Sequence, residues 1–95
     1  MGRMIKDQKF RCGQIVATPG AIEKVDIEEM LAALSRHMKG DWGEELCAED
    51  REVNEDALLH GGRLLSVCRT KNGVRFWIIT ESDRSATTFL LPEEY

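Results

Sequence analysis

The sequence predicts an α+β domain in which an antiparallel sheet of three to four strands, with a C-terminal hairpin, packs against two to three helices. The middle of the chain, 26–62, carries apolar residues at helical spacing between capping residues. The last third contains three short segments of β-favouring residues, and an Asn-Gly pair separates the first two. Together these patterns indicate helices followed by an antiparallel sheet.

Length and composition are those of one soluble domain. The chain has 95 residues, a net charge of −4 and no apolar run long enough to cross a membrane. We expect a flexible basic arm over 1–9 and a single domain over 10–95. The N-terminus lacks a signal-peptide core, and the three cysteines form no C-x-x-C pair, so a cytoplasmic location is expected.

The first predicted elements are a strand at about 11–17 and a helical turn at 19–25, with Thr18 as its N-cap. A longer helix then begins after Asp26, which forms an Asp-x-x-Glu variant of the capping box with Glu29. Its expected buried stripe is Ile27, Met30, Leu31, Leu34 and Met38, and Gly40 ends it.

A second helix is predicted over 48–62, where acidic residues begin the segment and His60 with Gly61 end it. Its apolar stripe is thin, comprising Val53, Ala57 and Leu58, so this helix is expected on a surface. His37 occupies the equivalent last turn of the longer helix. We therefore interpret both histidines as capping or structural groups in preference to ligands.

The hairpin is predicted from the Asn72-Gly73 pair, which suits a two-residue type I′ turn with Lys71 opposite Val74. This register places Cys68 on the same face as Trp77. Both faces of the hairpin are then apolar, so we expect it to be central in the sheet and covered on both sides, or on one side by a second copy in a homodimer. The third strand, at 87–91, ends at a proline.

The cysteines and histidines do not indicate a zinc site. Structural zinc ligands come in closely spaced pairs, and Cys12, Cys47 and Cys68 are far apart in the chain. We interpret Cys68 as a small buried hydrophobic residue. No metal and no cofactor are predicted.

Three carboxylates raise an alternative. Asp41 lies in a Gly-Asp-Trp-Gly turn, while Glu81 and Asp83 follow the second strand of the hairpin, next to Arg84. Converging carboxylates with a nearby cation are what a magnesium-dependent nuclease or phosphodiesterase requires. The same residue types are ordinary in turns, which favours a structural interpretation.

Trp42 and the acidic stretch around it allow two interpretations each. Trp42 is either a plug over the junction of helix and sheet or an interface hot spot. The acidic residues of 44–56 are either a solvated helix face or a DNA-mimicking surface of an inhibitor of a restriction or related nucleic-acid enzyme. In either case this charge disfavours direct binding of duplex nucleic acid.

The strings "GDWG", "GGRLLSVCRT" and "WIITESDRSATTFLLPEEY" resemble a family of small uncharacterised bacterial proteins of plasmids and other mobile elements. Some members are loosely labelled plasmid-related or type I restriction–modification subunit. A restriction methyltransferase subunit is far longer, so the resemblance implies no enzymatic activity. It directs attention to Asp41, Trp42, Glu81, Asp83 and Arg84, and a pair between Asp41 and Arg84 would be a clasp or the rim of a binding site.

These observations predict a small non-enzymatic accessory protein of a plasmid or mobile element that acts by protein–protein contact. The expected contact residues are Trp42, Arg84 and the adjacent carboxylates of Asp41, Glu81 and Asp83. The metal-dependent nuclease and the acidic inhibitor are the alternatives.

Overall fold

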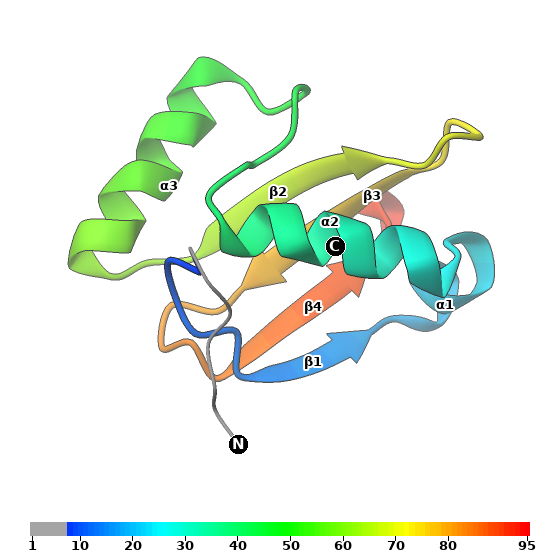
Figure 1. Cartoon of the computed structure of the whole chain (residues 1–95), viewed down its shortest axis with the longest axis horizontal. Helices are drawn as coiled ribbons and strands as arrows, with labels where there is room; N and C mark the ends of the chain where they lie inside the picture. The colour runs from blue at the N-terminus through cyan, green and yellow to red at the C-terminus, as the bar shows by residue number, and fades with distance from the viewer. Residues whose placement is uncertain (1–7) are drawn as a thin grey trace.

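The computed structural model describes residues 8–95, which form an α+β fold built on one four-stranded sheet (Figure 1). The predicted fold class is confirmed. Residues 1–7 of the predicted arm lie outside the described residues. In chain order the elements are β1 (Gln14–Ala17), α1 (Pro19–Lys24), α2 (Ile27–Met38), α3 (Ala48–His60), β2 (Leu64–Arg69), β3 (Arg75–Thr80), β4 (Ala86–Leu90) and the 3₁₀ turn η1 (Pro92–Glu94).

The strand order is β1-β4-β3-β2. The strands β2, β3 and β4 form an antiparallel meander, whereas β1 pairs in parallel with β4. Gly13 permits this pairing, because its φ is +65° and a Cβ at this position would lie 2.3 Å from the carbonyl oxygen of Ser85. In this strand order β2 is an edge strand and β3 is an inner strand, so the prediction that the hairpin is central in the sheet is wrong.

The register of the hairpin differs from the prediction by one residue. Cys68 pairs with Phe76 and Val67 with Trp77, so Cys68 and Trp77 lie on opposite faces. The loop between the strands is longer than a two-residue turn, since Thr70 is bonded to Val74 through their backbones and through its own hydroxyl. An Asn-Gly pair fits both the two-residue turn and the longer loop. The longer loop is favoured because its register places Phe76 on the buried face of the sheet.

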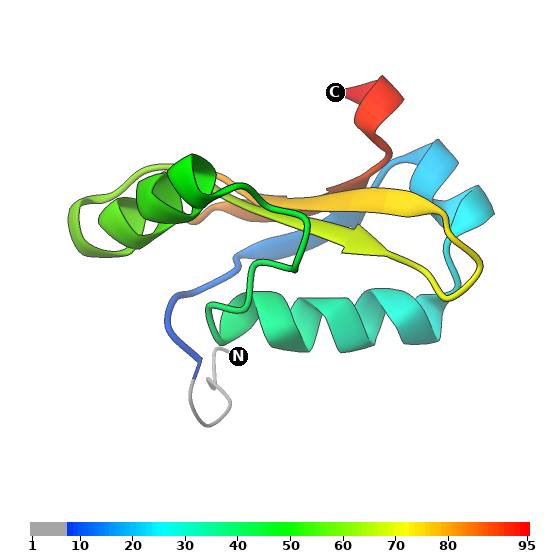
Figure 2. The ribbon, with the colours of Figure 1, turned by 90° about the horizontal axis from the view of Figure 1, so that it is seen from above.

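The helix α2 covers one face of the sheet, and α3 lies beside the β2 edge, nearly level with the strands (Figures 1 and 2). The stripe of α2 that faces the sheet consists of Met30, Ala33, Leu34 and His37. The predicted stripe is thus wrong at Ile27 and Leu31, which are exposed. The capping box is also absent, because Asp26 makes no side-chain cap bond and Glu29 accepts a bond from the Lys71 backbone.

The other predicted helices begin and end close to their expected limits. Thr18 caps α1 by accepting a hydrogen bond from the N–H of Ala21. Gly61 ends α3 with a φ of +87°, and His60 bonds to Asp56 one turn earlier. Within residues 8–95, no helix is both long and apolar enough to span a membrane.

Candidate functional site

The three carboxylates of the nuclease alternative do not converge. The Oδ1 atom of Asp41 accepts a hydrogen bond from the N–H of Gly43, and Oδ1 of Asp83 accepts one from the N–H of Ser85. Hydrogen bonding by Ser85 lowers the pKa of Asp83. Among the described residues, no three His, Cys, Asp or Glu side chains are grouped so that they could hold a metal ion. Both aspartates occupy positions that stabilise turns.

Trp42 is a core residue. It is 2% exposed, and its ring packs against those of Phe10 and His37, with centroid distances of 6.2 and 5.5 Å. Its indole N–H donates to Oε2 of Glu55 on α3 at 2.9 Å. This position agrees with the plug interpretation and leaves almost none of the ring for a partner.

Arg84 is bonded to the backbone rather than to Asp41. Its guanidinium donates to the carbonyl oxygens of Gly62 at 2.6 Å and Ala57 at 3.1 Å, and it also reaches the carbonyls of its own loop. Asp41 and Arg84 form none of the ion pairs found among residues 8–95. Arg84 therefore ties the β3–β4 loop to the C-terminal end of α3.

The acidic segment 44–56 is partly committed to internal contacts. Glu45 forms ion pairs with Arg69 and Arg75, at 2.6 and 3.1 Å, and Glu55 bonds to Trp42. Glu49, Asp50 and Glu52 are exposed on α3. Their exposure is that of a solvated helix face.

His37 forms a buried hydrogen-bonded network rather than a helix cap. It is 0% exposed, its Nδ1 lies 2.6 Å from Oγ of Ser66, and its Nε2 lies 2.9 Å from Oγ1 of Thr80. Thr80 bonds in turn to Thr87, whose hydroxyl donates to the carbonyl of Cys12. Burial lowers the pKa of His37 to about 4, so the imidazole is neutral at pH 7.

The network determines the tautomer of His37. Because the Thr87 hydroxyl donates to a carbonyl, it accepts from Thr80, and Thr80 must then accept from the Nε2–H of His37. The remaining Nδ1 accepts from Ser66. A serine bonded to a histidine resembles a nucleophile with its base, but Ser66 is 1% exposed and no substrate reaches it. The network is structural.

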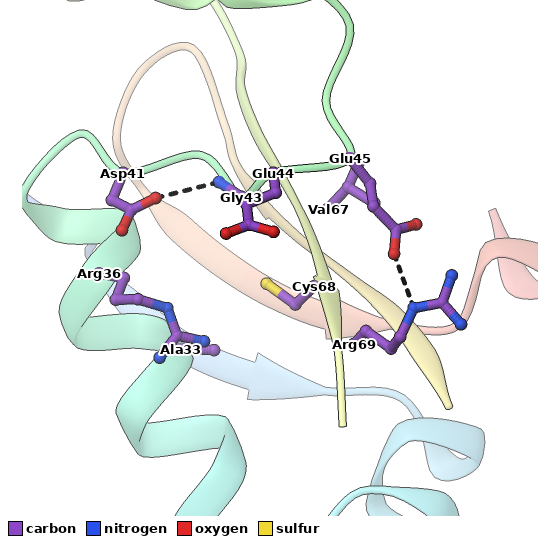
Figure 3. A pocket seen from close by; sticks show the side chains of 9 residues that line it. All are labelled: Ala33, Arg36, Asp41, Gly43, Glu44, Glu45, Val67, Cys68 and Arg69. Carbon is purple, nitrogen blue, oxygen red and sulfur yellow. Dashed lines mark hydrogen bonds and ion pairs between the residues drawn. The ribbon is translucent and has the colours of Figure 1, made fainter. Parts of the chain in front are cut away.

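A polar pocket of about 340 Å³ lies between α2, the 41–45 loop and β2 (Figure 3). Its charged lining residues are Arg36, Asp41, Glu44, Glu45 and Arg69. The hydrogen bond from Arg69 is the main factor that lowers the pKa of Glu45.

Cys68 is the one thiol in the lining of this pocket. Burial raises its pKa to about 11, which keeps the thiol protonated at pH 7 and unreactive as a nucleophile. Of the other cysteines, Cys12 is buried and Cys47 is exposed. The charges of the pocket mostly compensate one another, and no nucleophile and base are placed together in its lining.

An apolar groove, also of about 340 Å³, lies at the β1 edge of the sheet, between β1, α1 and α2. None of the residues that line it is charged or polar: Ile15, Val16, Ala17, Ile22, Val25, Ile27, Met30, Leu31 and Phe89. Ile22 and Ile27 are each 66% exposed and Leu31 is 57% exposed. Contiguous exposed apolar surface of this kind marks sites of interaction with other molecules.

The groove borders an open sheet edge. The N–H groups of Gln14 and Thr18 bond to Ser85 and Phe89, on the β4 side. Since alternate residues of a strand direct their backbone groups to the same side, Ile15 and Ala17 direct theirs away from β4. Within residues 8–95, no further strand pairs with this edge.

The opposite edge of the sheet is covered. The side-chain amide of Asn54 bonds to both backbone groups of Leu65, and the carbonyl of Trp42 accepts from the N–H of Val67. Natural sheets usually protect their edges in this way or with charged residues and proline. Within residues 8–95 no side chain covers the β1 edge in this way, and Gln14–Ala17 itself contains no charged residue and no proline. This edge and the adjoining groove are therefore the candidate binding site.

Sequence reasoning missed this groove because it assigned Ile27 and Leu31 to the core.

Comparison with protein-family models gives no match, and comparisons with curated proteins and with solved structures give none either.

Proposed function

We propose that the chain is a non-enzymatic interaction protein that binds an extended polypeptide segment by adding it as a strand to the edge of β1. The observation that carries this proposal is the juxtaposition of the open β1 edge with a charge-free groove, while the β2 edge is covered. In strand addition, the main chain supplies affinity and the side-chain pockets supply specificity. The resemblance noted above adds a plasmid or mobile-element setting to the proposal.

The test is selection of displayed random peptides against the full-length protein, followed by amide chemical-shift mapping of each selected peptide. We expect extended, apolar peptides that shift the amides of β1 and of the groove. Leu31→Glu should abolish their binding, because it places a carboxylate in the apolar groove.

Leu59→Glu is the matched control, since Leu59 is an equally apolar residue, 80% exposed on α3, away from the groove. Two outcomes would argue against the groove as a binding site: peptides that bind Leu31→Glu as well as the unmodified protein, or no selected peptides for a protein that is itself monomeric.

A further inference from the structure

We propose that the strand received by the β1 edge is β1 of a second copy, so that two chains join their sheets into one continuous sheet through antiparallel pairing about Val16. This inference rests on the proposed function and names its partner.

The backbone groups of the edge are self-complementary. Ile15 and Ala17 each direct an N–H and a C=O away from β4. In an antiparallel pair centred on Val16, Ile15 of one copy lies opposite Ala17 of the other, and each of the two donates its N–H to the carbonyl of the other. Ala17 of the first copy and Ile15 of the second form the same two hydrogen bonds. Every outward backbone group of Ile15 and Ala17 is then satisfied.

The side chains agree with this register. Ile15 pairs with Thr87 and Ala17 with Phe89, and Thr87 and Phe89 are both buried. Ile15 and Ala17 therefore lie on the face of the sheet that α2 covers. A two-fold axis perpendicular to the sheet places the α2 helices of both copies on the same side, where the exposed Ile27 and Leu31 of each copy lie next to the join.

The electrostatics allow an isologous contact. In such a contact each charged residue near the two-fold axis lies close to the same residue of the second copy, so a charged patch there would be repulsive. The lining of the groove carries no charge, although the whole chain has a net charge of −4. Two-fold dimers are also the commonest closed assemblies of soluble chains.

The test is sedimentation equilibrium of the untagged full-length protein from about 1 to about 200 µM, the range in which interfaces of modest size associate. We expect a species with twice the mass of the 10.8 kDa chain. Leu31→Glu and Ile15→Pro should each weaken dimerisation by about tenfold or more, because the first buries a carboxylate and the second removes an outward N–H.

Ile15→Pro leaves the β1–β4 ladder intact, since the N–H of Ile15 does not face β4. Leu59→Glu, on α3, should dimerise as the unmodified protein does. Hydrogen exchange supplies a second readout: the amides of Ile15 and Ala17 should become protected as the concentration rises.

A dimer that Leu31→Glu and Ile15→Pro leave unchanged would overturn the inference, because its interface would lie elsewhere. A monomer at every concentration would also overturn it. In that case, selected peptides that still bind the groove would preserve the proposed function, and failure of both assays would remove the proposed function as well.

Discussion

Asn54 takes the place of a neighbouring strand for Leu65. Its Nδ2 donates to the carbonyl of Leu65 at 2.7 Å, and its Oδ1 accepts from the N–H of the same residue at 3.1 Å. One buried side chain on α3 thus satisfies both outward backbone groups of Leu65 and anchors α3 beside the sheet. The contrast with β1, whose edge has no such cover within residues 8–95, is the basis of the proposed function.

Asn54→Ala should lower the free energy of unfolding by about 2 kcal/mol, because two hydrogen bonds are lost and the backbone groups of Leu65 lose their partner. Urea unfolding measures the change. Glu52→Ala, at an exposed position of the same helix, should stay within about 0.5 kcal/mol of the unmodified protein. Equal effects of the two substitutions would contradict the anchoring role of Asn54.

Stability should fall as the pH is lowered from about 6.5 to about 4, owing to His37. The folded-state pKa of this group is lowered to about 4, whereas an unfolded histidine titrates near 6.5. In that window the unfolded chain binds a proton that the folded chain does not, so the His37 contribution is complete above pH 6.5 and decreases below it. The loss by pH 4 should be roughly 3 kcal/mol.

The control for this pH dependence is His37→Gln, which cannot titrate. Its unfolding free energy should be lower at pH 7 but should depend less steeply on pH between 6.5 and 4. All other side chains are the same in both proteins, so the difference between the two curves isolates His37. Nitrogen-15 spectra of the ring should show the proton on Nε2, and a proton on Nδ1 would contradict the deduced network.

Thr87 and Thr88 are adjacent residues with opposite roles. Thr87→Val should cost about 2 kcal/mol, since it leaves the Thr80 hydroxyl without its acceptor and the buried Cys12 carbonyl without its donor. Thr88 is half-buried on the other face of β4, so Thr88→Val should change stability by less than about 0.5 kcal/mol. Thermal unfolding of both variants compares them directly, and similar losses would rule out the network as the cause.

The existence and order of the elements could be predicted from the sequence because they depend on local signals: caps, turn residues and apolar spacing. The orientation of α2 could not. Ala33 and His37 replace Ile27 and Leu31 on its buried face, and His37 is accommodated there because Ser66 and Thr80, far along the chain, supply its hydrogen bonds. Partners of this kind carry no local signal, so periodicity alone favoured the more hydrophobic residues.

The internal contacts of the expected site residues could not be predicted for a related reason. Trp42 and Arg84 belong to recognisable strings, but their contacts are internal. The β1 edge could not be recognised because its parallel pairing with β4 joins segments that are about seventy residues apart in the chain. Only the assembled sheet distinguishes an open edge from a covered one.

Arg84 allows its backbone and side-chain contributions to be separated. Among residues 8–95, Arg84 is the non-glycine residue with a positive φ, which is 62°. Its guanidinium ties the loop to Gly62 and Ala57. Arg84→Ala loses the hydrogen bonds and keeps the strain, while Arg84→Gly loses the same bonds and relieves it. Both should be destabilised, Arg84→Ala by about 3 kcal/mol, and Arg84→Gly should be the more stable variant by about 1 kcal/mol.

Chemical unfolding of the two Arg84 variants measures their order of stability. Hydrogen exchange at the C-terminal end of α3 measures how firmly the Arg84 side chain holds that end to the loop. Both variants should exchange faster than the unmodified protein in that last turn, because the carbonyls of Ala57 and Gly62 lose the donor that holds them to the loop. If Arg84→Gly proved less stable than Arg84→Ala, the left-handed backbone would not be a source of strain. The contribution of Arg84 to stability would then come from its side-chain hydrogen bonds alone.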